Sequence, residues 1–217
     1  MIELINATKY YQTNLGRKYI LDNVTLTIPS NKSIAILGSN GAGKSTLLRM
    51  LGGIDYPNKG IIRSKNIFSW PMGLAGGFQG SMTGRQNVKF VCRIYGENED
   101  HIKDAINFVK EFSELGDYFD MPIKTYSSGM KARLSFGLSL FFDFDYILID
   151  ETLSVGDPKF NKKAKEALMK KIEKSNAIVV SHATQILKDT CDVGIYLDKG
   201  KMHYFEDVQE AIDCYQK

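Results

Sequence analysis

The chain has 217 residues, of which 43% are hydrophobic, and its 28 basic and 25 acidic side chains leave a net charge of +3. This composition is typical of a folded globular protein and excludes a disordered or fibrous chain. The nearly neutral balance gives no reason to expect nucleic acid or an anionic membrane surface as a partner. Cys92, Cys191 and Cys214 stand far apart in the sequence, which favours a reducing compartment over a disulfide or metal framework.

The sequence gives no indication of a signal peptide or a membrane span. Its first residues, MIELINATKYYQ, lack the charged head and apolar run of a secretory signal. Residues 66–84 form a stretch of 19 residues without a charge, but it contains Pro71 and five glycines, which a lipid-facing helix tolerates badly. We therefore expect a protein that does not cross a membrane by itself.

The hydrophobic pattern predicts strands at the start, helices in the middle and an alternation of both at the end. The expected strands are residues 2–5, 19–28, 33–37, 61–68, 146–149, 177–180, 194–198 and 201–205. The expected helices are residues 44–53, 87–95, 100–115, 128–142, 160–174 and 206–217. This order predicts an α/β fold with a mostly parallel, covered sheet and a helical insertion over approximately residues 72–140.

A glycine-rich segment after the third strand predicts a phosphate-binding loop. Residues 38–45 read GSNGAGKS and fit the pattern G-x-x-x-x-G-K-S/T between a strand and a helix. Glycines let successive N–H groups point at phosphate oxygens, and the helix adds its N-terminal dipole. Lys44 would reach the β- and γ-phosphates and Ser45 would bind Mg²⁺. The expected phosphate ligands are Gly38, Ser39, Asn40, Gly41, Ala42, Gly43, Lys44, Ser45 and Thr46.

Two carboxylates follow the apolar strand expected at residues 146–149. Asp150 and Glu151 would then lie at the strand end where open α/β sheets bind ligands. Asp150 suits the support of Mg²⁺, and Glu151 is placed to polarise the water that attacks the γ-phosphate. An acidic pair after a strand is common, so it is the phosphate loop that makes this reading specific.

Between these two elements, residues 125–131 read TYSSGMK. The segment resembles the signature motif of ABC-type ATPases, usually written LSGGQ. Ser127 and Gly129 match its second and fourth positions, whereas Tyr126, Ser128 and Met130 depart from the others. The form YSSGM is similar to that of the subgroup that powers export of capsular polysaccharide, O-antigen and teichoic acid. The resemblance implies one P-loop NTPase domain over residues 1–217, with a RecA-like mixed sheet, an N-terminal antiparallel part and an inserted helical subdomain.

Further positions then match the family's motifs, and their roles are what the resemblance implies. Gln79 corresponds to the glutamine loop that contacts Mg²⁺, Asp157 to the D-loop and His182 to the catalytic switch histidine. Tyr11 corresponds to the aromatic residue that stacks on adenine, with Tyr10 as the alternative. Ser127, Ser128 and Gly129 would act in trans, on the ATP held by a second copy of the chain.

The resemblance also implies a working unit. Two copies would close head-to-tail around two ATP molecules with Mg²⁺, and hydrolysis would reopen them. The homodimer would dock on an integral membrane permease and drive a lipid-linked capsular polysaccharide outward, at the cytoplasmic face of the inner membrane. The segment around residues 79–93 would carry much of the docking surface. The alternatives are an O-antigen or teichoic acid exporter and a soluble ABC ATPase without a transport role.

Overall fold

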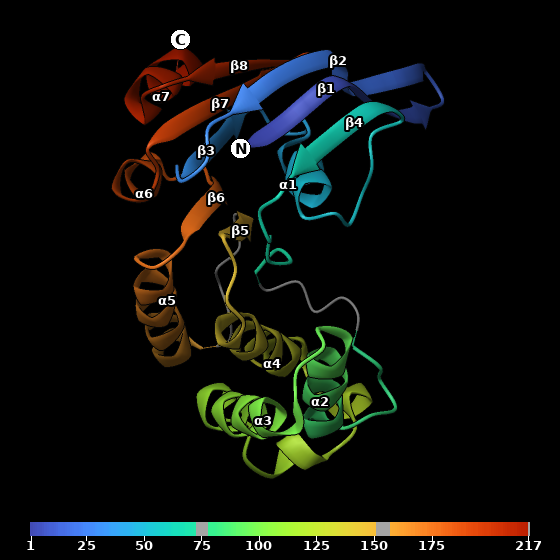
Figure 1. Cartoon of the computed structure of the whole chain (residues 1–217), viewed down its shortest axis with the longest axis vertical. Helices are drawn as coiled ribbons and strands as arrows, with labels where there is room; N and C mark the ends of the chain where they lie inside the picture. Colours follow the sequence, from blue (N-terminus) through green and yellow to red (C-terminus); the bar gives the residue numbers. More distant parts are fainter. Residues whose placement is uncertain (73–77, 151–156, 217) are drawn as a thin grey trace. The chain divides into compact units, whose positions relative to one another are not determined.

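The computed structural model describes residues 1–72, 78–150 and 157–216, and its elements are labelled in Figure 1. The chain divides into two compact units. The first comprises Met1–Pro71, Phe144–Glu151 and Ile172–Lys217, and the second comprises Met72–Asp143 and Thr152–Lys171.

The first unit contains an antiparallel sheet in the order β2-β1-β4, formed by β1 (Ile2–Thr13), β2 (Gly16–Ile28) and β4 (Lys59–Ser64). β1 is much longer than the expected strand at residues 2–5. Its pairing with β2 continues to Thr13 through register shifts, one of which surrounds Asn6 with its positive φ of 46°. Each shift interrupts the alternation of inward and outward side chains, so the outer half of β1 carries no period-two pattern.

The second sheet of this unit has the order β5-β6-β3-β7-β8. Its strands are β3 (Ile34–Gly38), β5 (Tyr146–Asp150), β6 (Asn176–Val180), β7 (Val193–Asp198) and β8 (Lys201–Phe205). The first four in this order are parallel, and β8 pairs antiparallel with β7. The mostly parallel sheet expected from the sequence is present, and the carboxyl ends of β3, β5 and β6 share one edge.

Among the residues that the structure describes, three helices complete the unit: α1 (Lys44–Leu51), α6 (Thr184–Thr190) and α7 (Val208–Gln216). α6 was not expected, because seven residues are too few for a clear helical period. Leu47, Leu48 and Leu51 of α1 are buried in one core with Ile36 of β3 and Leu4 of β1. Each such leucine contributes about 1.5–3 kcal/mol by its burial, and together they fix α1 directly behind the end of β3.

The second unit is helical, with α2 (Gly84–Ile94), α3 (Glu99–Ser113), α4 (Ser128–Phe141), α5 (Pro158–Ile172) and two short 3₁₀ helices, η1 (Gly116–Asp120) and η2 (Ile123–Thr125). α5 was expected in the α/β part, but it packs with the helical unit. The Phe160 ring lies 5.6 Å from that of Phe112, and Lys163 Nζ donates to the Phe112 carbonyl at 3.0 Å. These side chains meet across a long sequence separation, which periodicity cannot reveal.

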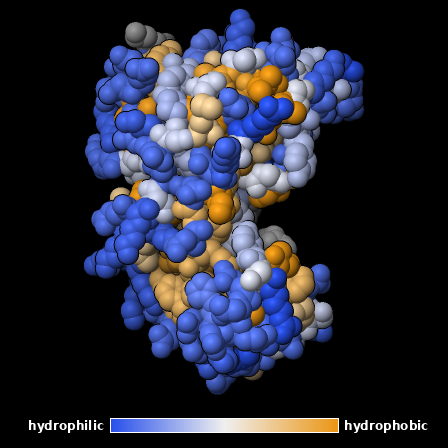
Figure 2. Space-filling view, viewed as in Figure 1, coloured by the Kyte–Doolittle hydropathy of each residue, from blue (hydrophilic) through white to orange (hydrophobic). Residues whose placement is uncertain are grey.

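The face shown in Figure 2 is mostly hydrophilic, with hydrophobic residues gathered at several places. Within the part of the chain that the structure describes, no helix has both the length and the apolar character needed to cross a bilayer.

Candidate nucleotide site

The phosphate loop lies between the end of β3 and the start of α1 in the first unit. Gly43 is the N-cap of α1 with a left-handed φ of 106°, and a Cβ there would lie 2.2 Å from Ile20 Cγ2. A Cβ on Gly38, with φ of 154°, would lie 2.8 Å from the carbonyl oxygen of Leu197. Only glycine fits both positions, so the loop needs these residues for its path as well as for access to phosphate.

The Lys44 side chain is bound to the backbone of this loop. Its side chain is buried, and Nζ donates to the carbonyl oxygens of Gly38 at 2.7 Å and Ser39 at 3.2 Å. The described first turn of α1 contains no acidic side chain, and Gly43 supplies no side-chain cap. Helix geometry directs the N–H groups of this turn toward the preceding loop. A buried ammonium beside a free helix N-terminus is suited to a polyphosphate.

Strand register places two further predicted residues at the same edge. Ile36 of β3 pairs with Val180 of β6, which pairs with Asp150 of β5. Asp150 therefore ends β5 at the level of the loop, and His182 comes two residues after β6. His182 Nε2 lies 3.0 Å from Asn40 Oδ1 in the loop. The structure thus brings His182 to the phosphate loop, while Glu151 lies outside the described residues.

The antiparallel sheet distinguishes Tyr11 from Tyr10. Tyr11 is paired with Lys18 and Tyr10 with Tyr19, and directly opposed residues share a face. Lys18 Nζ reaches the loop, since it would lie 3.3 Å from a Cβ on Gly41. Tyr11 is therefore on the loop side and 40% exposed. Because neighbouring residues in a strand face opposite ways, Tyr10 faces the other side, where Arg17 covers its ring at 4.5 Å.

Sequence reasoning missed the residues that hold Tyr11. Its hydroxyl donates to Asp55 Oδ2 at 3.1 Å, and Lys9 Nζ donates to Asp55 Oδ1 at 2.6 Å. Burial alone would raise the pKa of Asp55, but the hydrogen bonds from Lys9, the Tyr56 N–H and Tyr11 together lower it. Asp55 is therefore ionised at neutral pH and anchors the tyrosine. A lone Asp after a helix carries no sequence signal for this role.

The signature segment lies in the second unit, at the start of α4. Ser127 is the N-cap, and its Oγ accepts from the Met130 N–H at 3.2 Å. Ser128 begins the helix and Gly129 follows. Tyr126, which replaces the usual leucine, is a core residue that donates from its hydroxyl to the Tyr118 carbonyl at 2.6 Å. The departure from LSGGQ thus affects packing and leaves the helix N-terminus intact.

A hollow of about 390 Å³ opens beside the signature. It is lined by Glu114, Leu115, Tyr118, Ser127, Gly129, Met130, Arg133 and Asp157. The structure therefore brings the predicted D-loop residue to the same place as two of the three predicted signature residues. Arg133, which forms an ion pair with Asp157, was not singled out from the sequence.

Gln79 also belongs to the second unit, and buried Asn87 fixes its backbone. The Gln79 N–H donates to Asn87 Oδ1 at 2.8 Å, and Asn87 Nδ2 donates back to the Gln79 carbonyl at 3.2 Å. Both backbone groups of Gln79 are satisfied in this way, and its exposed side chain needs no part in the fold. Asn87 is fully buried, a role that one polar residue in an expected helix does not indicate.

Comparison with known proteins identifies the family. The sequence model of the ABC transporter family matches residues 21–154. The chain belongs to the ABC transporter family. It is accordingly an ATP-binding cassette whose ATP hydrolysis is coupled to transport, and the P-loop NTPase fold of the ABC type is confirmed. The solved structure of a dimeric bacterial ABC transporter cassette, MJ0796, matches 96% of this cassette and 99% of its own chain, with a TM-score of 0.73 and 25% identity.

Curated relatives match the cassette over its whole length. The polysialic acid transport ATP-binding protein KpsT of Escherichia coli is 56% identical over 100% of this chain and 99% of its own. The capsule polysaccharide export ATP-binding protein CtrD of Neisseria meningitidis is 44% identical over 99% and 98%. The O-antigen export system ATP-binding protein RfbB of Klebsiella pneumoniae is 31% identical over 99% and 88%.

Proposed function

We propose that this cassette is the ATP-hydrolysing subunit of a capsular polysaccharide exporter that works with a separate membrane permease. The observation that carries the proposal is the 56% identity over the full length to a polysialic acid transport ATP-binding protein. Relatives named for O-antigen and teichoic acid export are 31% and 34% identical. Export of either polymer is therefore the second candidate, and no observation favours a role outside transport.

The proposed chemistry uses the edge at which β3, β5 and β6 end. Lys44 and the loop N–H groups bind the ATP phosphates, and Tyr11 stacks on adenine. The Ser45 hydroxyl, the Asp150 carboxylate and the Gln79 amide are oxygen ligands of the kind that Mg²⁺ prefers. When bound, Mg²⁺ neutralises charge on the phosphates. Glu151 orients the attacking water, and His182 contacts the γ-phosphate from its position beside Asn40.

The proposed signature function requires a second copy of the chain. Ser127, Ser128 and Gly129 form the N-terminus of α4, which favours a negative charge. In the proposed homodimer they bind the γ-phosphate held by the partner, with Asp157 beside them. ATP then joins the two copies, and its hydrolysis removes the bridging phosphate and lets them separate.

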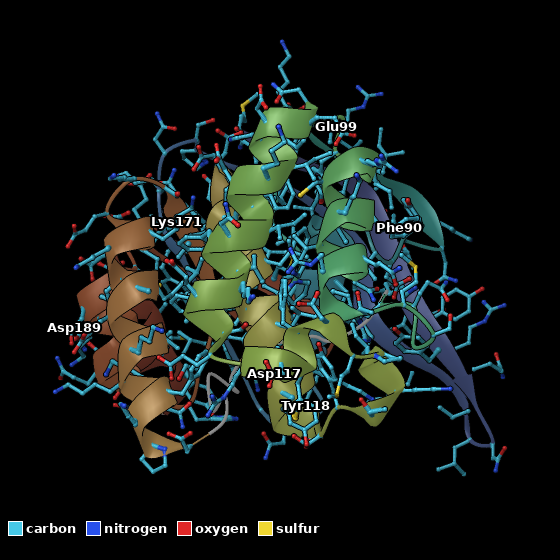
Figure 3. All side chains as sticks on the ribbon, turned by 90° about the horizontal axis from the view of Figure 1, so that it is seen from below. Phe90, Glu99, Asp117, Tyr118, Lys171 and Asp189 are labelled. Carbon is cyan, nitrogen blue, oxygen red and sulfur yellow. The ribbon has the colours of Figure 1, made fainter. Side chains whose placement is uncertain are left out.

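The proposed permease surface lies on α2. Phe90 and Ile94 are one helical turn apart and are 40% and 66% exposed; Figure 3 labels Phe90 on this helix. Exposed apolar side chains at helical spacing suit the insertion of a partner's helix or loop. Through this contact the cassette would be a peripheral protein at the cytoplasmic face of the inner membrane.

Deletion of the gene in its host tests the proposal. We expect loss of surface capsule with accumulation of the polymer inside the cell, restored by the unchanged gene and not by the Glu151→Gln variant at equal protein level. A host that keeps its capsule and loses O-antigen or teichoic acid would move the assignment to the second candidate. Normal amounts of all three polymers at the surface would reject export.

The docking surface is tested with two matched isoleucines. Ile94→Glu should abolish copurification with the permease and leave ATP hydrolysis by the isolated cassette unchanged. Ile67→Glu, at an isoleucine that is 58% exposed in the first unit, is the control and should copurify normally. Equal behaviour of the two variants would reject α2 as the docking surface.

A further inference from the structure

Arg133 joins the signature helix to the helix that follows the D-loop. It lies on α4, six residues after Ser127, and its guanidinium stands 4.5 Å from the ring centroid of Phe160 on α5. The same guanidinium donates to Asp157 Oδ2. Only 19% of the Arg133 side chain is exposed. Stacking on an aromatic face together with a carboxylate partner holds an arginine in one orientation.

Asp157 has a second role on its other oxygen. Its Oδ1 accepts from the N–H groups of Lys159 at 2.9 Å and Phe160 at 3.0 Å, and so caps the start of α5. The hydrogen bond from the Phe160 N–H lowers the pKa of Asp157. Burial opposes this shift, and the Lys159 N–H and the charge of Arg133 add to it. One ionised carboxylate thus binds the helix it begins and the helix beside it.

Both partners line the hollow at the signature, together with Ser127 and Gly129. The lining of that hollow therefore includes a link between two helix N-termini. One belongs to α4, whose cap is Ser127, and the other to α5, whose cap is Asp157. An ion pair that is half exposed contributes little to overall stability, so its consequence lies in the relative placement of the two helix starts.

We propose that Arg133 is a positioning residue for ATP hydrolysis, which holds Asp157 and the start of α5 against the signature helix. The signature and the D-loop residue then reach the second copy as one preformed surface. If the two segments moved separately, both would have to be ordered each time the dimer closes. The entropic cost of that ordering would slow closure. This inference rests on the proposed dimer, in which the signature acts in trans.

The substitution Asp157→Asn separates the two roles of this side chain. Asparagine keeps the oxygen that caps α5 and is as good an N-cap as aspartate, but it removes the charge that Arg133 binds. We expect kcat for ATP hydrolysis to fall about 10-fold, an effect typical of small misplacements in an active site. ATP affinity of the single chain should stay within about 2-fold, because the phosphate loop is in the other unit.

Arg133→Gln should reproduce this result, and the double variant should be no slower than either single variant, because both remove the same link. In a Glu151→Gln background, light scattering should show that each change weakens the ATP-dependent dimer about 10-fold. Asp120→Asn is the matched control: it breaks the exposed Arg85–Asp120 ion pair in the same unit, and kcat and dimer should not change.

The outcomes separate this inference from the dimer on which it rests. A Glu151→Gln parent that stays monomeric with ATP overturns both. A parent that dimerises, with Asp157→Asn and Arg133→Gln as active as the unchanged protein, overturns the inference alone. Losses that add in the double variant, or an equal loss in Asp120→Asn, also overturn it, since they indicate independent roles or general destabilisation.

Discussion

The phosphate loop and the signature segment bind the same proposed ligand by opposite means. The loop is rigid through backbone constraint: glycines that admit no Cβ, a buried lysine and a strand on each side of β3. The signature is a helix N-terminus whose surroundings are joined by surface ion pairs, Arg133–Asp157 and Lys163–Glu114. The first arrangement can bind nucleotide within one chain. The second, in the proposed dimer, binds a phosphate that another copy supplies.

Glu151→Gln should have the largest effect. It tests whether ATP binding at the loop and dimer formation at the signature precede hydrolysis. Loss of the group that polarises water should lower kcat by about 10³-fold, with ATP binding retained and an ATP-dependent dimer accumulating. Steady-state hydrolysis and gel filtration with ATP measure both. Hydrolysis at the normal rate would remove Glu151 from its proposed role.

Lys44→Ala should act on the loop alone. Removal of charge-assisted hydrogen bonds costs about 1.5–3 kcal/mol each, so ATP should bind the single chain about 10- to 150-fold more weakly. Titration with a fluorescent ATP analogue measures this, with Lys124→Ala, a lysine of the second unit, as the control. An unchanged dissociation constant would contradict the assignment of the loop.

Tyr11→Ala compared with Tyr10→Ala tests which face of the antiparallel sheet meets adenine. Loss of base stacking costs about 1–3 kcal/mol, so the Tyr11 variant should bind ATP at least about 5-fold more weakly and the Tyr10 variant normally. The same titration decides. Because the proposed contact of Tyr11 is with adenine, which inorganic triphosphate lacks, binding of inorganic triphosphate should be equal in both variants. The reverse ranking for ATP would select Tyr10.

Thr83→Ala should have the smallest effect and is confined to the helical unit. Thr83 forms a capping box with Gln86 at the start of α2, and its loss should cost about 1 kcal/mol of unfolding free energy. Urea denaturation measures the loss, and Thr83→Ser should restore it. ATP affinity should stay normal in both variants. A parallel loss of ATP affinity would show that the two regions are less separable than we infer.

Sequence reasoning located local features well and long-range partners poorly. The phosphate loop was predictable because eight consecutive residues carry its chemistry, and most helices because their apolar period is intact. Asp55, Asn87 and Arg133 were missed because each contacts a residue that is separated from it in the sequence, with no periodic or motif signal. The outer half of β1 was missed because its register shifts remove the alternation that identifies a strand. α5 was expected in the α/β part because strand–helix order says nothing of Phe112 and Phe160.

Tyr126 has a consequence for how force could pass through the helical unit. Its hydroxyl is bound at the Tyr118 carbonyl, and a Cβ on Gly84 would lie only 2.6 Å from that hydroxyl. Gly84, the first residue of α2, and Tyr126, the residue before the signature N-cap, are thus in close contact. If the permease binds α2 as proposed, a displacement of that helix is transmitted to the signature through one side chain, that of Tyr126. The linkage is short, and its length is set by a tyrosine at the position where the LSGGQ form of the motif has leucine.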